Sequence, residues 1–143
     1  MARTTIHVST GPETVFAVLA DAFTYPQWVV GAKEVRRVDG EWPEPGATFH
    51  HSVGIGPITV RDTTSVVSCE PGRRLVLHAR ARPTGIARVE FELAVRDGGT
   101  EVIQIEEPIK GPTALLHNRV QDWLIDRRNR EGLRRLKQLA ERR

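Results

Sequence analysis

The chain has 143 residues, of which 39% are hydrophobic and 27% charged, with a net charge of +3 at pH 7. That length suits one domain, since most domains contain about 100–150 residues, and the composition excludes a mainly disordered chain. No apolar run approaches the roughly 20 residues that a membrane-spanning helix needs, so we expect no membrane insertion. The first residues lack the apolar stretch of a secretory signal, and Cys69 is the one cysteine, which excludes an internal disulfide. We therefore expect a cytoplasmic protein.

The first third of the chain predicts one strand and two short helices. Alternation of Ile6 and Val8 predicts a strand over residues 4–9. Residues 9–13 combine a cap with an early proline, which is typical of a helix start, and this helix extends to about Asp21. Residues 23–30 predict a second short helix, which ends at Gly31.

From residue 35 onward, apolar and polar residues alternate, as they do in strands with one buried face. Turns rich in glycine and proline separate the strands at intervals of about 10–13 residues, which predicts an antiparallel meander. Pro108 is expected to stop the last strand. The six predicted strands cover residues 35–40, 48–53, 59–69, 75–82, 87–96 and 100–107.

A long helix over residues 113–142 completes the chain, since no proline interrupts this segment. It is strongly basic: residues 119–143 contain nine Lys or Arg and four Asp or Glu, a balance of +5, whereas the rest of the chain carries −2. Such a segment can bind nucleic acid or an acidic membrane surface. Because acids are interleaved with bases, we favour a solvated helix face and expect no nucleic-acid partner. The outline predicts an α+β domain.

Several segments carry a resemblance to one superfamily. They are Thr5-Ile6-His7-Val8, residues 11–21, Tyr25-Pro26-Gln27-Trp28, Asp97-Gly98-Gly99-Thr100 and residues 128–137. With them, nearly the whole chain resembles the START-like (SRPBCC, helix-grip) superfamily, in its polyketide cyclase/dehydrase-like branch. None of these segments is a catalytic signature, so the resemblance informs fold more than function.

The resemblance implies a single START-like domain over residues 1–143. Its sheet would be seven-stranded, antiparallel and curled around the long C-terminal helix, with two short helices after the first strand. Members of the superfamily usually hold an apolar cavity between sheet and helix. They bind lipids, sterols, polyketides, quinones or plant hormones, and some cyclise or hydrolyse the ligand.

The residues themselves also favour a cavity. Aromatic residues make up only 6% of the chain, and small side chains at Ala79, Ala81 and Ala87 would leave space on a concave face. The alternative is a core filled by Leu, Ile and Val from elsewhere. On the helix, the face of Leu133 and Leu136 extends to three polar residues, which need partners or water if buried. These are Asn118, Asp122 and Asn129, and for Asn129 a loop carbonyl is the favoured partner.

Two side chains on predicted inward faces are candidate acid–base groups. His51 shares a face with Phe49, and a histidine in an apolar cavity can exchange protons near neutral pH; the alternative is a hydrogen-bonded core residue. Glu107 alternates with Ile103 and Ile105, and apolar surroundings would raise its pKa; the alternative is a solvated rim position. The candidate catalytic residues are His51, Glu107 and Asp122. The predicted ligand contacts are Trp28, Phe49, His51, Val89, Phe91, Ile103, Ile105, Asn118 and Asp122.

No metal or cofactor is expected. The five histidines lack the spacing of metal ligands, and there is no phosphate-binding loop and no Gly-x-Ser-x-Gly motif. An apolar patch lies opposite the inner face of the helix and offers a partner surface or a homodimer interface. It consists of Leu116, Val120, Trp123 and Leu124.

We conclude from the sequence that the protein binds a small hydrophobic ligand, such as a lipid, polyketide or aromatic compound, between sheet and C-terminal helix. The alternative is an enzyme of the polyketide cyclase or dehydratase type. That alternative needs at least two of His51, Glu107 and Asp122 within about 3 Å of a common substrate atom, directly or through one water.

Overall fold

The computed structural model describes residues 1–55, 57–81, 85–115 and 118–143. Seven antiparallel strands form one sheet in the order β1-β7-β6-β5-β4-β3-β2. The strands are β1 (Ala2–Val8), β2 (Ala32–Asp39), β3 (Thr48–Ile55), β4 (Ile58–Glu70), β5 (Arg74–Ala81), β6 (Gly85–Arg96) and β7 (Gly99–Lys110). The helices are α1 (Pro12–Leu19), the short 3-10 helix η1 (Ala22–Thr24), α2 (Tyr25–Trp28), α3 (Pro112–Leu115) and α4 (Arg119–Glu141).

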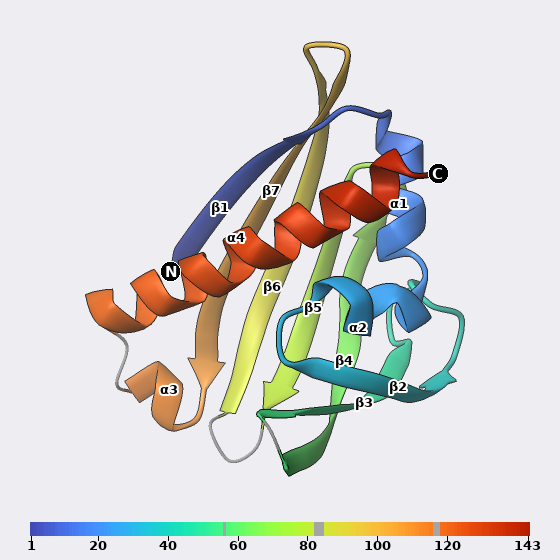
Figure 1. Cartoon of the computed structure of the whole chain (residues 1–143). Coiled ribbons are helices and arrows are strands. Elements are labelled where there is room, and N and C mark those ends of the chain that lie inside the picture. The colour runs from blue at the N-terminus through green and yellow to red at the C-terminus, as the bar shows by residue number, and fades with distance from the viewer. Residues whose placement is uncertain (56, 82–84, 116–117) are drawn as a thin grey trace.

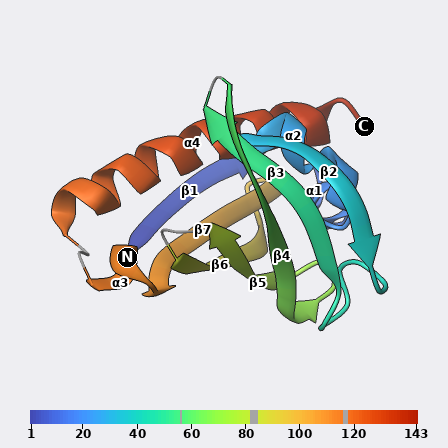
Figure 2. The same ribbon diagram turned by 90° about the horizontal axis from the view of Figure 1, so that it is seen from below.

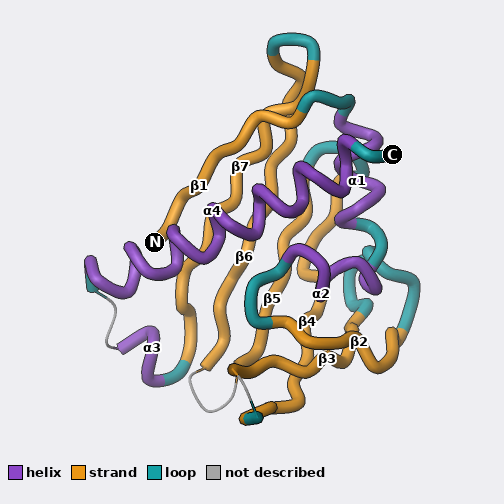
Figure 3. The backbone as a smooth tube through the Cα atoms, in the orientation of Figure 1, coloured by secondary structure: helices purple, strands orange, loops and turns teal. Residues whose placement is uncertain are grey.

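The sheet curls around one side of α4, so the predicted α+β helix-grip fold is confirmed. Helix α4 runs diagonally across the concave face, with α1 and α2 beside its C-terminal half (Figure 1). Seen from below, the strands from β7 round to β2 wrap beneath the helix as an arc (Figure 2). The backbone trace shows that the first turns of α4 extend past β1 at the edge of the sheet (Figure 3).

Strand alternation explains the core. Leu75 pairs with Phe91 and Leu77 pairs with Val89 across β5 and β6, so apolar side chains meet on the concave face. From the other side, α4 contributes a stripe that is fully buried against the sheet and α1. This stripe consists of Leu133, Leu136 and Ala140.

The turn between β6 and β7 follows its sequence closely. Asp97 and Gly98 both have positive φ, 48° and 74°, as a two-residue hairpin turn of type I′ requires. The predicted hairpin at this position is therefore confirmed.

The long C-terminal helix was predicted as one piece and is two. Asn118 has extended backbone angles and its side chain accepts a 2.9 Å hydrogen bond from the backbone N–H of Gln121, so it caps α4. An asparagine followed three residues later by glutamine is close to the known capping pattern. This capping pattern is present in the sequence, but the absence of proline from residues 113–142 favoured a single uninterrupted helix.

Strand β7 also differs from its prediction, because it continues past Pro108 to Lys110. Its pairing with β1 reaches only Glu106, opposite Ala2, whereas its pairing with β6 continues through Pro108. Beyond Glu106 the strand therefore has one neighbour instead of two. Proline is tolerated in strands with such a free edge, because its position there needs no N–H to donate to a second neighbouring strand.

Candidate ligand-binding site

A cavity of about 560 Å³ lies between the concave face of the sheet and the N-terminal half of α4. Three groups of elements form its walls: β5, β6 and β7 as the floor, β2, β3 and β4 on one side, and α2 with α4 as the cover. Most of its lining is apolar. The principal apolar residues are Trp28, Phe49, Leu77, Val89, Phe91 and Ile125.

Small side chains on the floor help to keep this space open. Ala79 of β5 and Ala87 of β6 are cross-strand partners, and both line the cavity. Larger residues at this pair would project directly into the space under α4. The prediction that alanines on the concave face leave room is thus supported by their placement.

Trp28 is held rigidly above the cavity. Its Nε1 donates to the Thr24 hydroxyl at 3.2 Å, and its ring meets Phe91 edge to face with centroids 5.7 Å apart. The Tyr25 ring lies 4.7 Å from it and is itself anchored by a hydrogen bond from its hydroxyl to the Leu19 carbonyl. Trp28 is therefore both a wall of the cavity and a fixed part of the core.

His51 lies on the β3 wall, as predicted. It is 6% exposed, and its Nε2 lies 3.0 Å from the hydroxyl of Thr64 on β4. Burial lowers the pKa of the His51 imidazole, although the nearby Asp62 carboxylate acts in the opposite direction. The ring is therefore neutral at neutral pH and presents a hydrogen-bonding group within an apolar wall.

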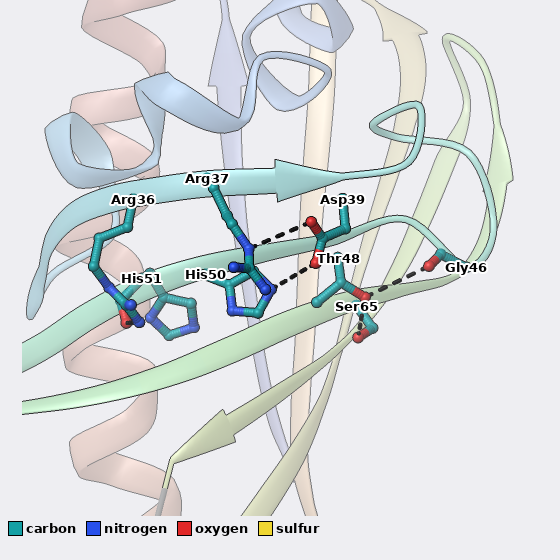
Figure 4. Close-up of polar contacts among 8 residues, drawn as sticks. All are labelled: Arg36, Arg37, Asp39, Gly46, Thr48, His50, His51 and Ser65. Atoms are coloured by element: carbon teal, nitrogen blue, oxygen red, sulfur yellow. Dashed lines mark hydrogen bonds and ion pairs between the residues drawn. The ribbon is translucent and has the colours of Figure 1, made fainter.

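The neighbour of His51 on β3 points away from it. The His50 ring contacts the carboxylate of Asp39 on β2, at 2.7 Å, and lowers the pKa of that carboxyl. Figure 4 shows this pair together with Arg36, whose guanidinium donates to the backbone carbonyl of His51 from the neighbouring strand. The two histidines lie on opposite faces because successive side chains alternate along a strand.

A second polar group lies across the cavity, on β7. Glu106 is buried, and its two carboxylate oxygens accept hydrogen bonds from α4: Oε2 from the Arg128 guanidinium and Oε1 from Asn129 Nδ2 at 3.2 Å. Gln104, two residues earlier on the same face of β7, is also buried and lines the cavity. The carboxylate thus links sheet and helix through the wall of the cavity.

The sequence pointed to the wrong face of β7. Glu106 and Gln104 stand opposite Val89 and Phe91 of β6, which fixes the even-numbered residues on the concave side. Ile103, Ile105 and Glu107 therefore lie on the outer face, and none of them lines the cavity. The isoleucines made the odd face look like the core face, yet they are half-buried on the outside beside the long side chains of neighbouring strands.

The two polar helix residues predicted to line the cavity also lie elsewhere. Asn118 caps α4, and Asp122 accepts a 2.8 Å hydrogen bond from the amino group of Met1. In this half of α4, a different set of positions faces the cavity. The α4 residues on the cavity are Gln121, Leu124, Ile125, Arg128, Asn129 and Gly132.

Asn129 faces inward as predicted, but its partner is the Glu106 carboxylate instead of a loop carbonyl. Of the predicted apolar patch, Val120, Trp123 and Leu124 are more than half exposed, while Leu116 lies outside the described residues. Leu124 additionally contributes to the cavity rim. The Arg127 guanidinium covers the Trp123 ring at 5.5 Å.

In the part of the chain that the structure describes, no three His, Cys, Asp or Glu side chains are grouped as a metal ion would require. No described helix is long and apolar enough to cross a membrane.

The fold and its cavity agree with a comparison to protein families. Residues 2–141 match the family described as polyketide cyclase / dehydrase and lipid transport. The chain belongs to this family. The predicted START-like resemblance, in its polyketide cyclase/dehydrase-like branch, is thereby confirmed. No curated protein sequence is similar enough to count as a match.

Several solved structures share the fold of this polyketide cyclase/dehydrase family member. Protein NE0264 from Nitrosomonas europaea superposes with a TM-score of 0.76 at 15% identity, over 98% of this chain and 93% of its own. Ara h 8.0201 gives 0.76 at 11% identity, over 99% and 97%. StfQ, a di-domain ARO/CYC from the steffimycin biosynthetic pathway, gives 0.75 at 14% identity, over 98% of this chain and 50% of its own. At these identities the likeness concerns the fold alone.

Proposed function

We propose that the protein binds a small hydrophobic molecule in the cavity between sheet and α4. The observation that supports this is the cavity itself: about 560 Å³, with a mostly apolar lining and a few polar groups. Ligand pockets in proteins typically measure about 300–1,000 Å³ and have this mixture of walls. The family description, which includes lipid transport, agrees with such a role.

The shape of the walls suits a guest with flat or branched apolar parts. Trp28 in the cover and Phe91 on the floor offer ring faces and edges, while Ala79 and Ala87 leave depth at the floor. Removing apolar surface of the ligand from water provides the driving force, at about 25 cal/mol per Å². The ligand-binding residues in this proposal are Trp28, Phe49, His51, Val89 and Phe91, with Glu106 and Gln104 in place of Ile103, Ile105, Asn118 and Asp122.

The enzyme alternative loses its specific support. Of its three candidate groups, His51 lines the cavity, whereas Glu107 lies on the outer face and Asp122 is bonded to the amino terminus. The carboxylate that does reach the cavity, Glu106, is on β7, and three strands separate it from His51 on β3. Binding without turnover is therefore the function that we propose, in one START-like domain, and the single cysteine still favours the cytoplasm.

Filling the cavity tests the proposal. Ala87→Phe adds a ring to the cavity floor, and Ala94→Phe adds the same ring at an exposed position of the same strand. Protein purified from its own host is measured by native mass spectrometry, and a panel of lipids, polyketides and quinones is screened by thermal shift. We expect a bound small molecule, or a shift with one class, in the wild type and Ala94→Phe but not in Ala87→Phe. Absence of both in the wild type, or unchanged binding in Ala87→Phe, would overturn the proposal.

A further inference from the structure

Glu106 provides the strongest polar feature of the cavity, and its surroundings define what it can bind. A carboxylate has about four lone-pair sites. Arg128 and Asn129 each use one of them, and both approach from α4. On the sheet, the side chains beside Glu106 on the cavity side include Val89, its partner on β6, and Gln104 and Pro108, two residues before and after it on β7. Of these three, only the Gln104 amide has a hydrogen-bond donor.

The remaining acceptor sites of Glu106 can therefore be satisfied by a donor on a molecule inside the cavity. Gln104, on the same face of β7, adds an amide that donates through nitrogen and accepts through oxygen. A hydroxyl group matches this pair, because it can donate to the Glu106 carboxylate and accept from the Gln104 amide. A carbonyl or an ether lacks the donor that the carboxylate needs.

Charge narrows the choice further. A ligand carboxylate placed at Glu106 would meet a like charge in a site of low dielectric, where repulsion is strong. A ligand ammonium would meet the Arg128 guanidinium, which already compensates the carboxylate. A neutral hydroxyl avoids both conflicts. The ring pair of Trp28 and Phe91 lies beside this position, since Phe91 is the β6 partner of Gln104.

We propose that Glu106 and Gln104 form a subsite for a neutral hydroxyl group, so that the ligand is a hydroxylated ring compound, a phenol or cyclic alcohol, and not a carboxylic acid. This inference rests on the proposed binding function. It adds the polarity and the charge of the ligand group that lies against β7. Glu106 is then the residue that determines specificity.

Three probes with one ring system test the subsite: 2-naphthol, 2-naphthoate and naphthalene, titrated calorimetrically at pH 7. The wild type should bind 2-naphthol roughly tenfold more tightly than 2-naphthoate or naphthalene, the factor expected from one hydrogen bond to a charged group. In Glu106→Gln this preference should fall to within about threefold, because the like charge is gone and Arg128 then favours the carboxylate. Glu107→Gln, one residue away on the outer face, should behave as the wild type.

Naphthalene also reports on the integrity of the cavity in each variant. If Glu106→Gln does not fold, two results still test the subsite. One is the preference of the wild type for 2-naphthol, and the other is Gln104→Leu, which should lower the affinity for 2-naphthol alone. Binding of the rings without preference for the hydroxyl, or a preference that survives in a folded Glu106→Gln, would overturn the subsite while leaving the binding function intact. If no ring binds and no molecule co-purifies, the binding function itself is wrong, and the subsite with it.

Discussion

Gly132 of α4 lies directly against the backbone of Trp28: a Cβ atom at this position would stand 3.0 Å from the Trp28 carbonyl oxygen. The missing side chain lets the helix approach α2 closely, and Trp28 is in turn the upper wall of the cavity. One glycine in the helix thus sets how closely α4 and α2, the two helices that cover the cavity, pack against each other.

The first prediction follows from this contact. In Gly132→Val, the branched side chain must displace α2 or bend α4, and we expect the free energy of unfolding to fall by about 1–3 kcal/mol. Urea denaturation measures it. Gln138→Val places the same residue at an exposed position of α4, where only helix propensity acts and the loss should stay below about 0.7 kcal/mol. Equal losses in the two variants would show that the contact is unimportant.

The second prediction concerns the link between Asn129 and Glu106. Asn129→Leu removes one donor from a buried carboxylate, so stability should fall by about 1–3 kcal/mol. In the double variant Glu106→Leu/Asn129→Leu, both polar groups are replaced by apolar ones, and the combined loss should be less than the sum of the single losses by at least about 0.5 kcal/mol. Strict additivity in the urea transitions of the three variants would contradict this link.

The third prediction is a pH dependence that arises from His51. Its pKa in the folded protein is lowered from 6.5 by burial, so below 6.5 the unfolded state binds the proton more readily and folding becomes less favourable as pH falls. His51→Gln retains a partner for Thr64 and removes this titration. Between pH 7.5 and 5, its stability should decline less steeply than that of the wild type, as thermal unfolding across this range can show.

The control for His51 is Val35→Ala, at the β2 residue paired with His51. It removes cavity-wall methyl groups and no titratable group. It should lower stability at all pH values and leave the wild-type slope unchanged. A His51→Gln slope that matches the wild type would mean that the buried imidazole does not contribute.

The fourth prediction concerns the outer face of the sheet. Arg74 donates two hydrogen bonds to Glu90, at 3.0 and 3.1 Å, and lowers the pKa of this carboxyl from 4.5 to about 2. The resulting stability is present above pH 4.5 and is lost as pH falls toward 2. Arg74→Met should therefore destabilise the protein slightly at pH 6, since Arg74 is partly exposed and its ion pair is screened by solvent, and the deficit should shrink at pH 3.

A matched substitution on the same sheet is Arg96→Met, at the exposed end of β6, where the ion pair with Glu101 is open to solvent. Surface pairs of this kind contribute little, so its urea midpoint should stay near the wild-type value at both pH values. A deficit of Arg74→Met that is as large at pH 3 as at pH 6 would exclude the ion pair as its cause.

Most of the fold followed from local patterns. Alternation from Ala87 to Arg96, the Asp97-Gly98 turn and the early Pro12 each act over a few residues, so they report directly on strand, hairpin and helix start. The break before α4 was missed because it depends on a single capping residue, Asn118. The residues on either side of Asn118 are compatible with one continuous helix.

The site was harder to predict, because face assignment on β7 depends on its neighbours. Ile103 and Ile105 are the more apolar set, and a rule based on hydrophobicity places them inside. Pairing with Phe91 and Val89 instead turns Gln104 and Glu106 inward. Two polar residues on a concave face are tolerated because the cavity and α4 supply partners, and neither of these can be deduced from the strand alone.

The bonds that Arg128 and Asn129 make to Glu106 pin α4 to β7 at a single turn of the helix. These bonds prevent α4 from moving away from β7 as a whole, although the helix can still tilt about this turn. Widening of the cavity is therefore expected on the side away from β7, where Val30, Ala32 and Val35 line it. We therefore expect a ligand to enter the cavity on that side.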